Sequence, residues 1–337
     1  MSPLQLALCL LIKCSIAIQL PCDIFASGST PCVAAHSTVR ALFSTFNGSL
    51  YQVKRSSDNN TLNISVISTG GYADAASQDK FCQHTNCIIQ RIYDQSSQNN
   101  HLDIAPPGGN AEHYDKAVNA SRQPLTVDNQ QNGTTKVYAA YFEGGMGYRI
   151  DKTSGVAIGN EAEVIYMVTS GKHYNSGCCF DYGNAETDNH DDGKGTMEAL
   201  NFGNNTRSNG GHGEGNGPWV MVDLENGLWA GNSTTVQKGN TPLTSDFVFA
   251  MVKGGTNGFA LKGGDVNNGL LKTMYDGPRP SGYQPMRKQG SIILSIGGDN
   301  SDWAKGTFFE GAMIKGYTNN DIDTAVYNNV VSVKYKL

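Results

Sequence analysis

The chain carries many short apolar segments that end at Gly, Asn or Asp, and this pattern constrains its fold more than any other feature. The clearest segments lie at 136–142, 162–168, 218–225, 246–252, 291–296 and 311–317. Segments of this length between turn residues are typical of β-strands. Because they do not alternate with long helical segments, they indicate two packed sheets rather than a parallel sheet with crossover helices. We therefore predict an all-β sandwich or jelly roll.

Two segments have the spacing of short helices. Thr30 and Pro31 resemble a helix cap and first turn, and apolar residues follow at helical spacing. These apolar residues are Ala35, Val39, Leu42, Phe43 and Phe46. A second helix is predicted at 321–330. The sequence contains no linker, repeat or break in composition, so we predict one domain over residues 18–337.

The N-terminus and the glycosylation motifs indicate a secreted protein. Residues 4–12 are apolar and residues 15–17 resemble a small-residue cleavage site, so residues 1–17 are predicted to be a signal peptide. Asn-x-Ser/Thr sequons, which can accept N-linked glycans, occur at Asn47, Asn59, Asn63, Asn119, Asn132, Asn204 and Asn232. No later segment is long and apolar enough to span a bilayer. We expect a soluble extracellular protein.

Composition argues against several classes of partner. The formal charge of -5, without any basic run, argues against nucleic acid and anionic membranes. The 7 histidines lack the spacing of metal ligands. The glycine-rich segment 210–217 lacks the Lys-Ser/Thr of a phosphate loop. We therefore expect neither a metal nor an organic cofactor.

The cysteines outside the signal peptide fall into close pairs. They are Cys22, Cys32, Cys82, Cys87, Cys178 and Cys179. The first two pairs each flank a short polar loop that a disulfide would close. Cα atoms across a trans peptide lie ~3.8 Å apart, below the usual ~4.4–6.8 Å of a disulfide, so a bond between Cys178 and Cys179 must distort the backbone. Such strain tends to occur at functional sites. The alternative is that each thiol pairs with a distant cysteine or stays free.

The segment PWVMVDLENG places acidic and aromatic residues on one face of a predicted strand. A two-residue period sets Trp219, Met221, Asp223 and Glu225 on one side, with apolar residues at the alternate positions. Two carboxylates in line with an aromatic ring are suited to present acids to a sugar. For each carboxylate, the alternative is a solvated strand end or a structural hydrogen bond.

The segment SIILSIGGDN carries a further candidate acid. The same period places Asp299 on one face with Ile293 and Ser295. Gly297 and Gly298 remove side chains just before this acid, so we expect a ligand to lie against the backbone there.

Five motifs resemble those of a known family. They are PCDIFASGSTPCVAAHSTVRALFS, YDQSSQNNHLDIAPPGG, GCCFDYGNAET, GPWVMVDLENGLWAG and GGDNSDWAKGTFFEG, in this order from residue 21 onward. Together they resemble the catalytic domain of fungal-type α-L-arabinofuranosidases B, glycoside hydrolase family 54. The resemblance implies a concanavalin-like β-sandwich. It also implies a retaining exo-hydrolase that releases terminal α-L-arabinofuranosyl groups from arabinan and arabinoxylan of plant cell walls.

The resemblance also implies roles for individual residues. The glutamate of DLEN, Glu225, matches the nucleophile, and the aspartate of GGDN, Asp299, matches the general acid/base. Three further positions match sugar-binding residues, namely Asp223, Asn226 and Gly298, and Trp219 is an additional candidate. Cys178 and Cys179 match a vicinal disulfide that lines the sugar subsite.

The retaining mechanism sets a geometric expectation. It needs two carboxyl groups roughly 5–5.5 Å apart, so Glu225 and Asp299 are expected to meet across neighbouring strands. Mutual repulsion should raise the pKa of one of them, and desolvation by Trp219 or the sugar should help to keep Asp299 protonated. The competing candidate acids are Asp223, Glu198 and Glu310.

The sequence departs from the family pattern in two places. Family members typically carry a tryptophan in the loop after FGN, whereas residues 204–217 contain none, so Arg207 or His212 is a candidate to replace its contact. No C-terminal arabinose-binding module is expected after the catalytic domain, and we expect a monomer. Two other functions stay open, a non-catalytic lectin on the same fold and a related β-xylosidase or endo-glycosidase.

Overall fold

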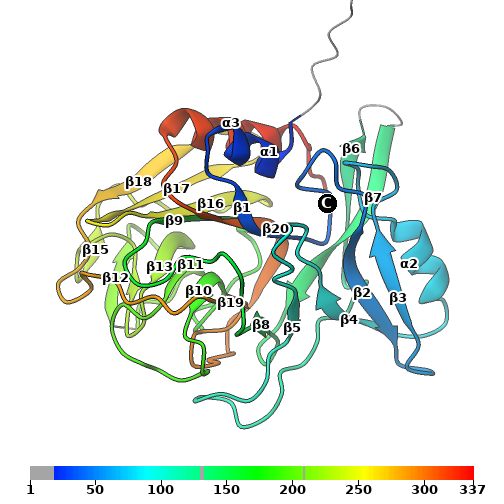
Figure 1. Ribbon diagram of the computed structural model, residues 1–337, viewed down its shortest axis with the longest axis horizontal. Helices are drawn as coiled ribbons and strands as arrows, with labels where there is room; N and C mark the ends of the chain where they lie inside the picture. Colours follow the sequence, from blue (N-terminus) through cyan, green and yellow to red (C-terminus); the bar gives the residue numbers. More distant parts are fainter. Residues whose placement is uncertain (1–18, 130–132, 208) are drawn as a thin grey trace, which may run out of the picture.

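Two β-sheets and three short helices make up the described part of the protein, as Figure 1 shows for the computed structural model. The structure describes residues 19–129, 133–207 and 209–337. The signal peptide predicted at 1–17 lies outside these residues. The architecture is mostly β, as predicted, although it has three helices where the sequence indicated one or two.

The first sheet has eight strands. Its strands, in spatial order, are β18 (Lys272–Gly277), β17 (Phe259–Asp265), β16 (Val248–Gly254), β9 (Glu163–Thr169), β20 (Gly306–Lys315), β7 (Gly133–Phe142) and β6 (Gln123–Asn129), and β1 (Cys32–Ser37) also pairs with β20. The register sets Tyr166 of β9 opposite Met251 of β16 and Ala312 of β20. The predicted strands at 136–142, 162–168, 246–252 and 311–317 all belong to this sheet.

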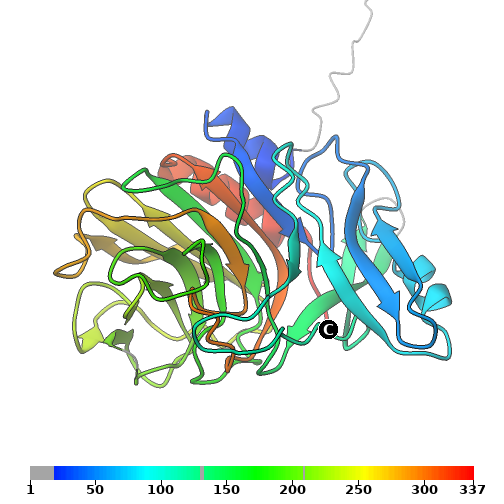
Figure 2. The ribbon, with the colours of Figure 1, turned by 60° about the horizontal axis from the view of Figure 1, so that its bottom comes forward.

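The second sheet has twelve strands and carries the remaining predicted strands. In spatial order they are β15 (Val236–Gln237), β12 (Gly210–Gly213), β14 (Leu228–Trp229), β13 (Trp219–Asp223), β11 (Glu198–Gly203), β10 (Asp181–Ala185), β19 (Ser291–Leu294), β8 (Tyr148–Ile150), β5 (Leu102–Ile104), β4 (Cys87–Ile92), β2 (Ser49–Arg55) and β3 (Thr61–Ser65). Most neighbours are antiparallel, but β12 runs parallel to β14 and β15. In Figure 2 the strands β2, β3 and β4, in blue and cyan, lie at the opposite end of the molecule from β12 and β15.

The two sheets pack through their central strands. A Cβ added to Gly183 of β10 would stand 2.8 Å from Cδ1 of Ile165 in β9, so the close approach of the sheets leaves no space for a side chain there. The other face of the first sheet contacts the helices α1 (Pro21–Ser27) and α3 (Asn320–Val331), which lie side by side in Figure 1. Phe249 of β16 contacts Tyr327 of α3 edge to face. Both faces of these strands are therefore buried.

The helix predicted from Thr30 onward is absent, and a strand takes its place. Residues 32–37 form β1, in which every position is buried because the strand lies against β20. The hydroxyl of Thr30 donates to the carbonyl of Phe25 at 3.1 Å, so it closes α1 rather than opening a new helix. A continuous apolar run is compatible with a strand buried on both faces, and the long-range pairing with β20 outweighs the helical spacing. The helix predicted at 321–330 is confirmed as α3.

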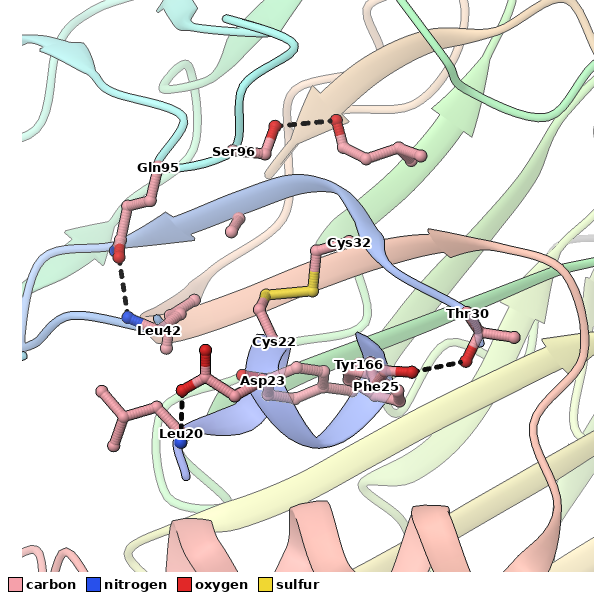
Figure 3. Close-up of a disulfide and its surroundings, with 12 residues drawn as sticks. Leu20, Cys22, Asp23, Phe25, Thr30, Cys32, Leu42, Gln95, Ser96 and Tyr166 are labelled. Carbon is pink, nitrogen blue, oxygen red and sulfur yellow. Dashed lines mark hydrogen bonds between the residues drawn. A yellow bond between two sulfur atoms is a disulfide. The ribbon is translucent and has the colours of Figure 1, made fainter. Parts of the chain in front are cut away.

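A disulfide joins the first helix to the first strand. Figure 3 shows the bond between Cys22 of α1 and Cys32 of β1, with a Cα separation of 5.6 Å. The Asp23 carboxylate accepts the main-chain N–H of Leu20 at 2.9 Å and that of Ser44 at 2.8 Å. These contacts cap the helix and fasten the start of the described chain to the core. Cys82 and Cys87 form a second disulfide that follows α2 (Ala75–Phe81), a helix the sequence analysis did not predict.

The surface positions of the sequons vary. Asn47, Asn59, Asn63, Asn119 and Asn232 are exposed, whereas Asn132 lies outside the described residues. Asn204 is half-buried, and its Cβ lies 2.6 Å from the position of a Cβ on Gly217. Within the described residues, no helix has the length and apolar character needed to cross a bilayer.

Candidate active site

A pocket of about 300 Å³ lies where the segments that follow β13 and β19 meet the segment that precedes β10. It is lined by Cys178, Cys179, Asp191, Arg207, Asn209, Asp223, Glu225, Asn226, Gly227, Leu228, Gly297, Gly298, Asp299 and Ser301. Figure 1 places the labels of β13, β11, β10 and β19 in one region of the second sheet. The fold thus gathers the two predicted catalytic acids and the adjacent cysteines around one cavity, although they are far apart in the chain.

Glu225 lies in a turn rather than on a strand face. The strand β13 ends at Asp223, and Glu225 and Asn226 both adopt left-handed backbone conformations, with φ of 61° and 58°. The main-chain N–H of Glu225 donates to Asp223 Oδ1 at 3.1 Å, and the Tyr283 hydroxyl donates to the Asn226 carbonyl at 2.9 Å. These conformations are unusual for residues with side chains and often mark functional sites. The alternation predicted for this segment therefore ends before the acid.

Asp299 also lies in a loop. The strand β19 ends at Leu294, so the predicted alternation does not extend to this acid. The Ser301 hydroxyl donates to Asp299 Oδ1 at 2.6 Å, and the side-chain amide of Asn110 donates to Oδ2. The main-chain N–H of Asn110 donates to the Asp299 carbonyl at 2.9 Å. The loop that contains Asn110 thus holds the acid from outside the second sheet.

The two acids do not meet across neighbouring strands. In the sheet order, β11 and β10 lie between β13 and β19. The prediction that Glu225 and Asp299 meet across neighbouring strands is therefore wrong. The acids reach one pocket because each is placed on a loop beyond the end of its strand, where the chain is free to turn toward the cavity.

The adjacent cysteines form a disulfide at the pocket wall. Their Cα atoms are 2.9 Å apart across a cis peptide bond. The N–H of Cys179 donates to the Ser301 carbonyl at 3.2 Å, and the N–H of Trp303 donates to the Cys178 carbonyl at 3.0 Å. Cys179 is fully buried, whereas Cys178 is partly exposed toward the cavity. These hydrogen bonds tie the disulfide to the loop that carries Asp299.

The pocket offers little to a metal ion. Among the described residues, the side chains with ligand spacing are those of Cys178, Cys179 and Asp223. Thiolates are the sulfur ligands of metals, and both of these sulfur atoms are bonded to each other. The group therefore has only one conventional ligand.

Trp219 lies behind the pocket and does not line it. Its ring is 1% exposed and packs in a small cluster with Cys179, Met221 and Leu228. The indole N–H donates to the Glu214 carbonyl at 2.7 Å. The face of β13 that was expected to be open is covered by this cluster. Trp219 thus packs against Cys179 on the side away from the cavity and does not present its ring to a ligand.

Two buried aspartates, Asp181 and Asp223, lie next to the disulfide. Burial raises the pKa of Asp181 to about 8 and raises the pKa of Asp223 well above its usual range, with the neighbouring Asp181 charge as the next cause. The two carboxyl groups lie close enough for each to affect the pKa of the other. The amide of Asn201 donates to Asp181 Oδ1 at 2.5 Å. Because two ionised carboxylates repel each other, this buried pair favours a proton on one of the two groups.

The pKa of Glu225 is raised, but burial is the main cause and repulsion from Asp299 is not. Desolvation by burial raises its pKa to about 10, and the charges of Asp223 and Glu186 contribute next, ahead of those of Asp191 and Asp299. The proposed partner Asp299 is therefore only a minor cause of the shift. The buried acids around Glu225 therefore favour its protonated form.

Sequence reasoning missed Glu186, a buried acid that lies near Glu225. Glu186 is fully buried and directly follows β10. A Cβ on Gly298 would stand 1.9 Å from Glu186 Oε2 and 3.0 Å from Glu225 Oε2. Gly298 lines the pocket, and the absence of its side chain also makes room for the two carboxyl groups. Glu186 belongs to the motif GCCFDYGNAET, and that position was the available signal.

The competing acids Glu198 and Glu310 are used elsewhere. Glu198 forms buried ion pairs with Arg279 at 2.7 Å and Lys288 at 2.9 Å. Glu310 pairs with Arg40 at 2.6 Å. Neither residue lines the pocket. Both acids have structural roles, Glu198 in β11 of the second sheet and Glu310 in β20 of the first, because buried carboxylates require charged partners.

Residues 204–217, the segment without the expected tryptophan, offered Arg207 and His212 as candidates to replace its contact. Arg207 is exposed and lines the cavity. His212 does not line it, because its ring packs against Trp219 with centroids 5.3 Å apart. Of the two candidates, Arg207 alone is in a position to contact a bound ligand.

Comparison with known proteins places this architecture in a family. The family model described as "Alpha-L-arabinofuranosidase B, catalytic" matches residues 21–336. A probable alpha-L-arabinofuranosidase B of Aspergillus clavatus is 50% identical over 336 residues, which cover 98% of this chain and 65% of that protein. The alpha-L-arabinofuranosidase B of Aspergillus niger is 49% identical over 321 residues, or 94% of this chain and 63% of that protein. The chain therefore spans just under two thirds of the length of these relatives.

Solved structures agree with the sequence comparison. An α-L-arabinofuranosidase of glycoside hydrolase family 54, soaked with a cyclic sulfate inhibitor, superposes with a TM-score of 0.91 at 48% identity over 95% of this chain and 66% of that chain. A glutamate-to-glutamine variant of such an enzyme, soaked with 4-nitrophenyl α-L-arabinofuranoside, gives the same TM-score of 0.91 at 49% identity. A third structure is described as an arabinofuranosidase complexed with arabinofuranosyl-α-1,2-xylobiose, with a TM-score of 0.91.

Proposed function

The chain belongs to the alpha-L-arabinofuranosidase B catalytic family, glycoside hydrolase family 54, and on this basis we propose that it is a retaining, exo-acting α-L-arabinofuranosidase. Its substrates are terminal arabinofuranosyl groups on the arabinan and arabinoxylan of plant cell walls. The observation that carries this proposal is that Glu225 and Asp299 line one cavity together with the Cys178–Cys179 disulfide. A cavity of about 300 Å³ is at the small end of ligand pockets and suits a single sugar better than a polymer strand.

Glu225 is the nucleophile of the proposed mechanism and Asp299 is its acid/base. Asp299 gives a proton to the leaving oxygen while the Glu225 carboxylate attacks the anomeric carbon, so the glycosidic C–O bond breaks as a glycosyl–enzyme bond forms. Asp299 then takes a proton from water, which displaces Glu225 and releases arabinose. The hydrogen bonds from Ser301 and Asn110 hold Asp299 in place for both steps.

The remaining pocket residues bind the sugar. The Cys178–Cys179 disulfide has no strong hydrogen-bond donor, so it offers a rigid contact for the apolar face of a furanose ring. Asp223, Asn226 and Gly298 are positioned to contact the sugar hydroxyls from the opposite segments of the pocket wall. The Asn226 amide already donates to Asp191 at 2.9 Å, so its orientation is fixed before a ligand binds.

The fold and the setting of the enzyme follow the same proposal. The two packed, mostly antiparallel sheets are consistent with a concanavalin-like jelly roll. Three disulfides and exposed sequons suit a secreted protein that acts on extracellular polysaccharide, because disulfides persist in oxidising compartments. We propose that it acts as a monomer.

Hydrolysis of 4-nitrophenyl α-L-arabinofuranoside tests the proposal. We expect release of 4-nitrophenol by the wild-type chain and a loss of most of the turnover in Glu225→Gln. The exposed Glu161 serves as a matched control, and Glu161→Gln should keep wild-type activity. No release above the blank would favour a lectin. Xylose or oligosaccharides from arabinoxylan, in place of free arabinose, would favour the xylosidase or endo-acting function.

A further inference from the structure

Glu186 lies outside the pocket lining but contacts the proposed nucleophile. It directly follows β10 and is fully buried. Its Oε2 and the Oε2 of Glu225 both lie within 3.0 Å of the point where a Cβ on Gly298 would stand. The Glu186 and Glu225 carboxyl groups therefore approach each other beside Gly298. Glu186 is therefore the neighbour through which the protein holds one side of Glu225.

The rest of Glu186 is anchored firmly. Its Oε1 accepts a hydrogen bond from the Thr196 hydroxyl. Its main-chain carbonyl accepts from Arg149 Nη2 at 2.5 Å, while Arg149 Nη1 donates to the Gly298 carbonyl at 2.9 Å. Arg149 is 2% exposed. One guanidinium group thus fastens both the Glu186 segment and the Gly298 segment, so the position of the Glu186 carboxyl relative to the pocket is fixed.

The second carboxyl oxygen of Glu186, Oε2, has only another carboxyl group as a neighbour with which to form a hydrogen bond among the described residues. Within residues 19–129, 133–207 and 209–337, no N–H or hydroxyl group donates to Glu186 Oε2. The group that approaches this oxygen beside Gly298 is the Glu225 carboxyl group. Contact between two carboxyl groups is stabilising when one of them carries a proton and repulsive when both are ionised. The geometry therefore calls for one proton shared by this pair.

The charge environment supports such a proton. Burial raises the pKa of Glu186, and it raises that of Glu225 to about 10. The charged and titratable groups that face Glu186 are Glu225 and Asp223 from the β13 segment and Arg149 from β8. Attack by Glu225 requires the ionised form, so in the reactive state the shared proton must be on Glu186.

We propose that Glu186 is a positioning residue for the reaction, a protonated carboxyl group whose Oε2–H donates to the Glu225 carboxylate. The donated hydrogen bond holds one oxygen of Glu225, leaves the other oxygen free to attack, and stabilises the ionised nucleophile. The proton stays on Glu186 throughout the cycle. This inference rests on the proposed function, because it assigns Glu186 a role only if Glu225 is the nucleophile.

The hydrogen-bond pattern of Glu186 predicts which substitution preserves the role. Oε1 accepts from Thr196 and Oε2 must donate to Glu225, and the amide of a glutamine has the same pattern of one acceptor and one donor. Glu186→Gln also cannot lose a proton. Glu186→Met has a similar size but cannot donate a hydrogen bond. A change in the orientation of a catalytic group commonly costs on the order of 10²-fold in rate.

The test compares kcat and KM of wild type, Glu186→Gln and Glu186→Met on 4-nitrophenyl α-L-arabinofuranoside between pH 4 and pH 9. We expect Glu186→Gln to keep kcat within about tenfold of wild type and to lose activity at higher pH than wild type does, because its donor does not titrate. We expect Glu186→Met to lose roughly 10²-fold in kcat with little change in KM.

The outcomes separate this inference from the proposed function. An active wild type, with Glu186→Gln as impaired as Glu186→Met or with an unchanged alkaline limb, would overturn the role of Glu186 alone. An inactive wild type would overturn the proposed function and this inference with it. If Glu186→Met does not fold, the pH profile of Glu186→Gln still decides the question.

Discussion

The Oδ2 atom of Asp223 lies 3.3 Å from the Sγ atom of Cys179. A sulfur atom in a disulfide carries no proton, so a hydrogen bond here requires a proton on Asp223. Burial and the neighbouring Asp181 raise the pKa of Asp223 well above its usual range, which favours that proton. The disulfide and the aspartate pair therefore form one unit in the wall of the proposed sugar site, in which a proton on Asp223 links the carboxyl group to the sulfur.

The vicinal disulfide should affect binding more than stability. Its bond closes a sequence separation of 1, so it removes almost no entropy from the unfolded chain. We expect the double variant Cys178→Ala/Cys179→Ala to raise KM for 4-nitrophenyl α-L-arabinofuranoside by about tenfold, the equivalent of ~1.4 kcal/mol, with a small change in Tm. The Cys22–Cys32 bond closes a separation of 10 and serves as the control. Its removal should lower Tm while KM stays near the wild-type value. The reverse pattern would contradict the proposed role of the disulfide.

Azide should distinguish the two proposed catalytic acids by product stereochemistry. In Glu225→Ala, azide takes the place of the missing nucleophile and attacks from its side, so the arabinosyl azide should have inverted configuration. In Asp299→Ala, Glu225 still forms the glycosyl–enzyme, and azide then displaces it to give retained configuration. An activated aryl leaving group is needed because the acid is absent. Nuclear magnetic resonance of the azide products identifies the configuration, and the opposite assignment would exchange the two roles.

The buried aspartates should make the protein less stable as pH rises. An Asp in an unfolded chain has a pKa of roughly 3.9. The pKa of Asp181 in the folded protein is about 8. Between these values the folded state keeps a proton that the unfolded state has released, so the free energy of unfolding falls as pH increases. Denaturant unfolding from pH 5 to pH 8 should show this slope.

The substitution Asp181→Asn should reduce that slope. The asparagine amide can donate to Asp223 without a titratable proton, so the variant should lose up to ~1.4 kcal/mol per pH unit of the dependence. Exposed Asp246 provides the control, and Asp246→Asn should keep the wild-type slope. Equal slopes in wild type and Asp181→Asn would show that the proton is held elsewhere.

Arg207 should contribute to substrate binding in the loop without a tryptophan. It is the candidate that lines the pocket, whereas His212 packs on Trp219. We expect Arg207→Ala to raise KM several-fold with kcat nearly unchanged, because a contact made equally in ground and transition states affects binding alone. His212→Ala, in the neighbouring strand β12, is the control. An unchanged KM in Arg207→Ala would leave the subsite without a contact from this loop.

Local patterns predicted the elements better than their connections. The strand segments and the helix at 321–330 were predictable because side-chain periodicity and turn residues are local properties. The helix predicted from Thr30 failed because residues 32–37 pair with β20, which lies far away in the chain. The aromatic face around Trp219 also failed, since alternation predicts which residues share a face but not what covers that face.

The sequence by itself determined the strand-rich class, the close spacing of the cysteine pairs and the motifs that contain Glu225 and Asp299. Tertiary structure alone decided that the turn after β13 and the loop after β19 share a pocket, and that Glu186 lies against Glu225. The physical reason is the sequence distance over which the deciding interactions act. Strand formation and loop closure depend on neighbours within a few residues, whereas burial, proton sharing and the meeting of distant acids depend on how two sheets pack.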